Sequence, residues 1–97
     1  MHVISRKTLR EFWEAHPDSE GPLKAWHAEA KAALWQTPAQ IKARYRTASI
    51  LRNSRVVFNI GGNKYRLIVR VNYKCGTVYV RFIGTHSDYD RIDAETA

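Results

Sequence analysis

Three side chains in the second half of the chain, Arg66, Arg81 and His86, have the chemistry needed to handle a phosphate group. A guanidinium offers paired donors to phosphate oxygens, and an imidazole with a pKa of about 6.5 can take or give a proton at neutral pH. The two arginines lie in stretches that alternate apolar and polar residues, and the histidine follows the second stretch. Because such alternation is typical of β-strands, the sequence predicts a phosphate-handling site on a rigid sheet.

The stretch 64–73 alternates without a break, so its side chains divide between the two faces of a strand. One face carries Tyr65, Leu67, Val69, Val71 and Tyr73, and the other carries Lys64, Arg66, Ile68, Arg70 and Asn72. The stretch 77–83 repeats the pattern, with Val78, Val80 and Phe82 against Thr77, Tyr79, Arg81 and Ile83. We expect one face of the sheet to be core and the other to be largely cationic.

Antiparallel pairing of these two stretches must keep their apolar faces together, because a slip of one residue turns every side chain over. A register with Tyr73 opposite Val78 meets this condition. The same register gives three further placements: Arg70 opposite Arg81, Asn72 opposite Tyr79, and Arg66 near Thr85. It predicts that Arg66, Arg81 and His86 converge at one end of the sheet.

The segment after the last predicted strand has the spacing of a helix start, since Thr85 and Asp88 are placed as in a capping box. On such a turn His86, Tyr89 and Asp90 point to one side. A structural capping cluster and an active site both fit this spacing. In an active site, Tyr89 could donate to a phosphate or stack on a base, and Asp90 could orient His86 or serve only as a helix-start charge.

These residues match the needs of RNA cleavage without a metal ion. In that reaction the ribose 2′-hydroxyl attacks the adjacent phosphate, which requires a base, an acid and cations. Arg66 and Arg81 can supply the cations, and His86 can carry the proton. His16 and His27 lie on apolar helix faces, where packing roles are expected, and His2 is uninformative. The histidines show no metal-ligand spacing, so we expect no metal and no cofactor.

Composition favours a polyanionic partner. The 97 residues contain 16 Lys and Arg against nine Asp and Glu, a net charge of +7 at pH 7. Nucleic acid is the leading candidate, with a merely solubilising basic surface as the alternative. Cys75 is the one cysteine, which excludes an intrachain disulfide and fits a reducing cytosol. No apolar run is long enough to span a bilayer, so we expect a soluble, cytoplasmic protein without a membrane partner.

Upstream of these strands, the sequence predicts helices that cover the sheet. A short strand over 2–5 precedes a helix from Lys7 with an apolar face of Leu9, Phe12, Trp13 and His16. After a turn over 17–22, a second helix begins at Pro22 and carries Leu23, Trp26, His27, Ala30 and Leu34. A third, short helix follows Thr37 as N-cap, with Gln40 reaching back, and ends near Arg44 or Tyr45. A linker over 47–54, a strand over 55–60 and a Gly61-Gly62-Asn63 turn complete an α+β order in a single domain, 1–97.

The third helix and the residue after it carry a basic cluster of Lys42, Arg44 and Arg46. This cluster could be a solvated face or a contact to the RNA backbone. The glycine pair at 61–62 is a weak candidate for a phosphate cradle, because it lies between two strands and does not open a helix.

The runs 55–69 and 78–94 closely resemble the HigB toxins of bacterial type II toxin–antitoxin systems, and 1–7 and 35–42 look similar as well. The resemblance therefore covers essentially the whole chain. Its most specific parts are Gly62-Asn63-Lys64-Tyr65-Arg66-Leu67 and Gly84-Thr85-His86 followed by Tyr89-Asp90.

This resemblance implies a RelE-like fold, a small antiparallel sheet packed on N-terminal helices, and the activity of an mRNA interferase. Many relatives act on mRNA in the ribosomal A site. A HigA-type helix-turn-helix antitoxin would neutralise the toxin and, with it, repress their operon by binding operator DNA. By motif position, the phosphate-contacting set is Lys64, Arg66 and Arg81, and the catalytic cluster is His86, Tyr89 and Asp90. Arg70 departs from the family pattern and is either an extra RNA contact or a solvated strand charge.

Two other hypotheses remain open. The chain could be a non-catalytic RNA- or DNA-binding module, or its main role could be to bind its antitoxin and operator DNA. All nucleic-acid-binding hypotheses predict salt-sensitive binding. Only the nuclease hypothesis predicts that His86→Ala abolishes cleavage while binding persists.

Overall fold

The computed structural model describes all residues, 1–97. The elements in chain order are β1 (His2–Ile4), α1 (Arg6–Ala15), the 3-10 helix η1 (Pro17–Ser19), α2 (Glu20–Ala32), α3 (Pro38–Arg44), β2 (Ser49–Ile50), β3 (Arg55–Ile60), β4 (Tyr65–Asn72), β5 (Thr77–Thr85) and α4 (His86–Tyr89). This α+β fold confirms the predicted class. The short strand β2 lies where the sequence predicts only a linker. None of the helices combines the length and hydropathy needed to span a bilayer.

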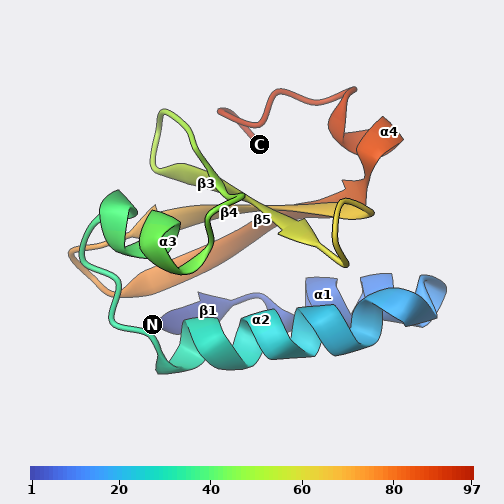
Figure 1. The fold of residues 1–97 in the computed structure, drawn as a ribbon, viewed down its shortest axis with the longest axis horizontal. Helices are drawn as coiled ribbons and strands as arrows, with labels where there is room; N and C mark the ends of the chain where they lie inside the picture. Colours follow the sequence, from blue (N-terminus) through green and yellow to red (C-terminus); the bar gives the residue numbers. More distant parts are fainter.

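The five strands form one sheet in the order β1-β5-β4-β3-β2. Strand β1 runs parallel to β5, and the other neighbours are antiparallel. In Figure 1 the helices α1 and α2 lie side by side beneath the sheet, while α4 and the C-terminal segment lie above it. The sheet therefore has a helical side and a second side on which the chain ends.

The main core lies between the sheet and the helical side. Helix α1 buries Leu9 and Trp13, and α2 buries Leu23, Trp26 and Ala30, which are spaced to share one helix face. The aromatic centre of this core is Phe58 on β3. The rings of Trp26, Trp35 and Tyr45 have centroids 5.4, 6.2 and 5.0 Å from the Phe58 ring. One strand residue thus anchors α2, α3 and the segment between them.

Helix α2 ends two residues before the predicted Leu34, which is 83% exposed. The prediction that Leu34 belongs to the helix face is wrong, because Ala33 is extended, with ψ of 156°. The N-terminal amine of Met1 donates to the carbonyls of Lys31 and Ala33, at 3.1 and 2.5 Å, and so satisfies the helix end. Pro22 is the third helical residue rather than the first, a position where no intrahelical N–H bond is lost.

The predicted register between β4 and β5 is wrong. Arg70 lies opposite Tyr79, not Arg81, and Val71 lies opposite Val78. A shift of two residues keeps the same faces together, so alternation could not distinguish the two registers. The turn decides between them: Asn72 Oδ1 accepts the N–H of Cys75 at 3.0 Å, and Gly76 adopts a left-handed φ of 68°.

A β-bulge interrupts the β4–β5 pairing and changes which side chains share a face. Val69 pairs with Val80 and Ile68 pairs with Phe82, so Arg81 is the extra, unpaired residue. Beyond the bulge the faces differ from the prediction. Ile83 packs on the main core with Val80, whereas Phe82 lies on the opposite side.

The predicted cationic face is therefore partly apolar. Val57, Ile68 and Ala94 are buried there in a second cluster, against which Leu51, Phe82, Tyr89 and Ala97 pack. The C-terminal segment supplies Ala94 and Ala97, so it covers the middle of this face. Arginines remain accessible only on either side of this apolar cover.

Candidate active site

Strand β4 and helix α4 bring Arg66 and His86 into contact. Nη2 of Arg66 lies in hydrogen-bonding contact with Nε2 of His86. The contact forms because Arg66 lies opposite Gly84, two residues before His86. Nη1 of Arg66 also faces the carbonyl oxygens of Asn63 and Tyr65, both at 3.4 Å. The guanidinium is thus held beside an exposed imidazole, as the sequence predicts for this pair.

The contact bears on which nitrogen of the imidazole accepts a hydrogen bond. A guanidinium carries only donors and stays protonated, so the ring nitrogen that faces it must accept. A hydrogen bond between these two groups thus requires the lone pair of Nε2, with the ring proton on Nδ1. A neutral imidazole beside a fixed cation is suited to act as a general base.

Helix α4 is held by the predicted capping box, which the structure confirms. Thr85 Oγ1 accepts the N–H of Asp88 and Asp88 Oδ2 accepts the N–H of Thr85, both at 3.2 Å. Hydrogen bonding of the carboxylate by the Thr85 N–H, and then by the Thr85 side chain, lowers the pKa of Asp88 below its ordinary value of 3.8. The box fixes His86 as the first residue of the helix.

Gly84 allows α4 to fold back on β5. A Cβ at this position would lie 2.5 Å from Cζ of Phe82 and 3.0 Å from Cβ of Asp88. No larger residue fits without moving either the second apolar cluster or the capping box. In the Gly84-Thr85-His86 run, glycine is therefore explained by the lack of space for a side chain, and histidine by its chemistry.

The structure does not bring the other members of the predicted catalytic cluster onto His86. Tyr89 is half-buried and packs against the second apolar cluster. The Asp90 carboxylate is exposed and makes no hydrogen bond or ion pair with His86. Their catalytic roles stay predictions.

The structure also separates Arg81 from the Arg66–His86 pair, so this part of the predicted convergence is wrong. Arg81 precedes Gly84 by three residues, which is roughly 10 Å along a strand. Its side chain lies with Arg55 and Arg70 in a hollow of about 360 Å³. Arg55 was missed by the sequence analysis, because only the β3–β4 register places it opposite Arg70.

Lys64, predicted to contact phosphate, instead forms an ion pair with Asp18 of η1. The hydroxyl of Tyr65 donates to the other oxygen of Asp18 at 2.6 Å. The bond to Lys64, and then that to Tyr65, lowers the pKa of Asp18, and the bond to Asp18 raises the pKa of Lys64. His16 stacks on Phe12, with ring centroids 4.3 Å apart, in the packing role predicted for it. The neutralisation of Lys64 had no sequence signal beyond an acidic residue in a turn.

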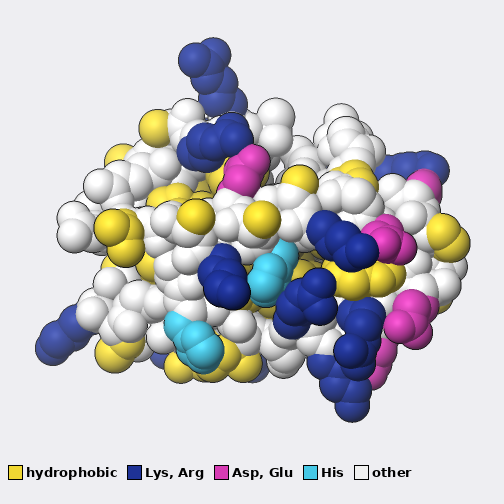
Figure 2. Space-filling model, turned by 90° about the horizontal axis from the view of Figure 1, so that it is seen from below, with side chains coloured by type: hydrophobic (Ala, Val, Ile, Leu, Met, Phe, Trp, Pro, Cys, Tyr) yellow, Lys and Arg dark blue, Asp and Glu magenta, His cyan; other side chains and the backbone are white.

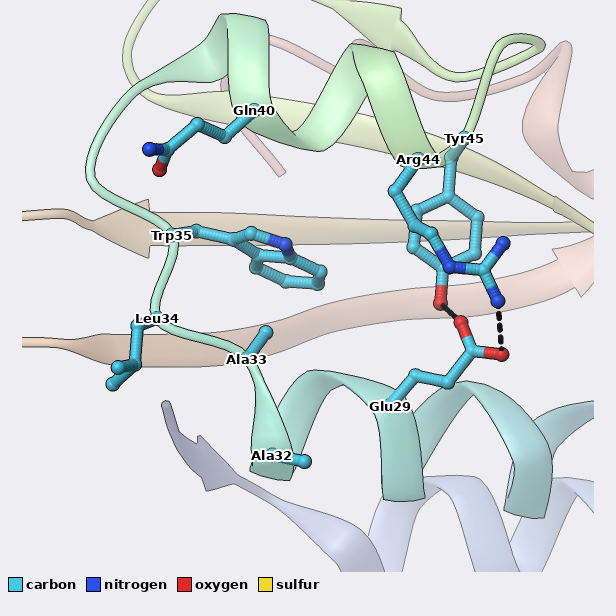
Figure 3. Close-up of a pocket in the computed structure, with 8 residues that line it drawn as sticks. All are labelled: Glu29, Ala32, Ala33, Leu34, Trp35, Gln40, Arg44 and Tyr45. Atoms are coloured by element: carbon cyan, nitrogen blue, oxygen red, sulfur yellow. Dashed lines mark hydrogen bonds and ion pairs between the residues drawn. The ribbon is translucent and has the colours of Figure 1, made fainter.

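The predicted basic cluster on and after α3 is largely occupied by protein partners. Figure 3 shows Arg44 and the Tyr45 hydroxyl both directed at Glu29, and Arg44 Nη2 lies 2.8 Å from Glu29 Oε1. Lys42 Nζ donates to the Ala48 carbonyl at 2.5 Å. Arg46 alone is exposed without a hydrogen bond or ion pair. RNA binding by these residues stays a prediction, and the partners of Lys42 and Arg44 compete with it.

No group of three or more His, Cys, Asp or Glu side chains is arranged to hold a metal ion. The groups that can do chemistry at this end of the sheet are the guanidinium and the imidazole. Together they can bind an anion and move one proton.

The α+β fold is consistent with that of RelE-like toxins. A family model described as HigB toxin, the RelE-like toxic component of a toxin–antitoxin system, matches residues 19–92. The chain belongs to this family. The Escherichia coli K12 protein named mRNA interferase toxin HigB is 28% identical over 92 residues, which cover 93% of this chain and 88% of the relative. The Shigella flexneri mRNA interferase HigB matches equally well. The mRNA interferase HigB of Escherichia coli O6:H1 is 26% identical over 94 residues, covering 95% of this chain and 91% of the relative.

Proposed function

We propose that this toxin is an mRNA interferase, an endoribonuclease that needs no metal ion. The observation that carries the proposal is the contact between the guanidinium of Arg66 and Nε2 of His86. Membership of the HigB family and the activity named for its relatives support it.

In the proposed reaction, Arg66 binds the non-bridging oxygens of the scissile phosphate. A guanidinium prefers a phosphate to a neutral imidazole, so RNA binding releases Nε2 of His86. Nε2 then takes the proton of the ribose 2′-hydroxyl as its oxygen bonds to phosphorus. The bond from phosphorus to the 5′-oxygen breaks, leaving a 2′,3′-cyclic phosphate.

Tyr89, Arg66 and Arg81 complete this chemistry. The departing 5′-oxygen takes a proton from solvent or from Tyr89, the hydroxyl-bearing side chain one turn beyond His86. Arg66 stabilises the extra negative charge of the transition state from a fixed position, which avoids reorganisation during the reaction. Arg81 adds positive charge on the same face of the sheet.

Family membership implies an antitoxin partner. The finer partners follow from the resemblance: a HigA-type helix-turn-helix antitoxin, operator DNA bound through it, and mRNA presented by the ribosome in the cytoplasm. The second candidate function is a non-catalytic RNA- or DNA-binding module. It is favoured by one observation, a group of arginines away from His86 that pair with no Asp or Glu.

The test is to map the 5′ ends of an mRNA translated by purified ribosomes, and of naked RNA with and without EDTA. Wild type should create new ends that persist in EDTA, and His86→Ala should remove them. His2→Ala, which replaces an exposed histidine on β1, is the matched control and should cut like wild type. If neither wild type nor His86→Ala cuts any substrate while both bind RNA equally, the binding module replaces the nuclease.

A further inference from the structure

A second basic site lies on the same side of the sheet as Arg66 and His86. Strand pairing places Arg55 opposite Arg70, and the bulge on β5 adds Arg81. These three side chains, with Asn53 and Ser54, line the hollow of about 360 Å³, and no apolar residue contributes to it. We call it the arginine hollow.

No Asp or Glu side chain pairs with the arginine hollow. The five ion pairs of the protein involve none of its three guanidinium groups. Burial, together with repulsion from Arg81 and Arg70, lowers the pKa of Arg55. An anion placed among three like charges would relieve their repulsion.

Two of the guanidinium groups already converge on one oxygen. Nε of Arg55 and Nε of Arg81 both donate to the main-chain oxygen of Ala97, the last residue of the sequence, at 3.0 and 3.2 Å. Arg55 is also held by a bond from Nη1 to the Asn53 carbonyl at 2.8 Å. Arg70 is exposed and makes no hydrogen bond, so its donors point to no protein atom. The geometry is that of a site for a group with several oxygens.

We infer that the arginine hollow binds a second phosphate of the RNA strand, a few nucleotides from the one that is cleaved. Arg66 and Arg70 lie on one face of β4, four residues or roughly 13 Å apart, so one strand of RNA can reach both. The absence of apolar lining argues against a protein segment as occupant, because protein interfaces have an apolar centre. This inference rests on the proposed function, and it assigns Arg55 to RNA binding.

The test measures the Kd of a short single-stranded RNA carrying 2′-O-methyl groups throughout, which cannot be cleaved, at several salt concentrations. Arg55→Gln and Arg70→Gln should each weaken binding about tenfold. Each should also reduce the slope of log Kd against log salt by about 0.7, the value for one lost phosphate contact on a single strand. Because Arg70 has no protein partner, Arg70→Gln should fold normally and keeps the test valid if Arg55→Gln unfolds.

The matched control is Arg10→Gln, which removes the same charge from α1 on the helical side. Arg10 pairs with Glu14 there at 3.9 Å, and Figure 2 shows several of the Lys and Arg side chains of that side next to Asp or Glu. Arg10→Gln should leave both Kd and slope unchanged. If Arg10→Gln and Arg70→Gln lost the same amount of RNA affinity, net charge alone would drive binding, and the inference would be overturned.

A second arm separates this inference from the proposed function. Wild-type cleavage of translated mRNA reports the function, whereas binding of the uncleavable RNA reports the hollow. If wild type cuts but Arg70→Gln binds RNA like wild type, the inference is wrong and the nuclease stands. If the hollow variants instead lose binding only to an acidic probe peptide, the occupant is an acidic protein segment and the inference is again overturned.

Discussion

Two groups of arginines on one side of the sheet differ in their neighbours. Arg66 contacts a titratable imidazole, and its contact partner can exchange a proton. Arg55, Arg70 and Arg81 have no titratable partner near neutral pH, so they can bind an anion but cannot move its protons. The comparison shows that the side chain next to an arginine, rather than the arginine itself, decides whether a site can be catalytic.

The apolar cluster of Val57, Ile68 and Ala94 separates these two sites. Other cations have acidic partners instead: Arg44 forms an ion pair with Glu29, and Lys64 forms one with Asp18. By contrast, Arg55, Arg66, Arg70 and Arg81, on the side of the sheet that carries His86, form no ion pair with Asp or Glu.

Among substitutions that test the difference between the two arginine sites, Arg66→Ala should have the largest effect. Loss of one preorganised donor to the transition state should lower the cleavage rate constant about 10²–10³-fold. Arg66→Lys keeps the charge but loses the two-point geometry, so it should restore only part of the rate. The measurement is single-turnover cleavage of translated mRNA. Wild-type rates for Arg66→Ala would remove this residue from the site.

Gly84→Ala tests whether steric fit positions His86. The added methyl group collides with Phe82 and Asp88, and overpacking of this kind typically costs about 1–3 kcal/mol of unfolding free energy. Cleavage should slow as well, because the start of α4 must move. Denaturant unfolding provides the stability measurement.

Gly21→Ala is the control, since its added Cβ in α2 would meet no atom within 4 Å beyond its chain neighbours and the backbone of the helix itself. This variant should be neutral or slightly more stable, because alanine favours helix. Equal stability of Gly84→Ala and wild type would contradict the steric role.

The smallest effect concerns pH. The pKa of Asp88 is lower in the folded protein than its ordinary value of 3.8, so its carboxylate stabilises α4. That contribution is present above pH 3.8 and is lost as the pH falls through the folded-state pKa. The amide resonance of Thr85, which donates to this carboxylate, should titrate in that acidic range by NMR. In Asp88→Asn the titration should disappear, and its persistence would assign it to another group.

Local features of this protein could be predicted from sequence, but long-range ones could not. The capping box of Thr85 and Asp88 and the N-cap at Thr37 are contained within four residues, so their spacing is sufficient evidence. The alternation in β4 correctly divided its faces. The β4–β5 register could not be predicted, because a shift by two preserves alternation.

The bulge at Arg81 and the cover provided by Ala94 depend on contacts between distant segments. For that reason the sequence grouped Arg81 with His86 and overlooked Arg55. The Arg66–His86 contact was predictable because it depends only on the approximate end of one strand pair.

The most direct test of this division between chemistry and binding is the single-turnover rate constant of mRNA cleavage as a function of toxin concentration. The curve yields a maximal rate constant and a half-saturating concentration for each variant. His86→Ala should lower the maximal rate constant by about 10²–10⁴-fold, the usual contribution of general acid–base catalysis, without changing half-saturation. Arg70→Gln should raise the half-saturating concentration and leave the maximum unchanged. Two results would contradict this separation of catalysis from binding. One is a His86→Ala protein with the wild-type maximal rate constant, and the other is an Arg70→Gln protein in which only the maximal rate constant falls.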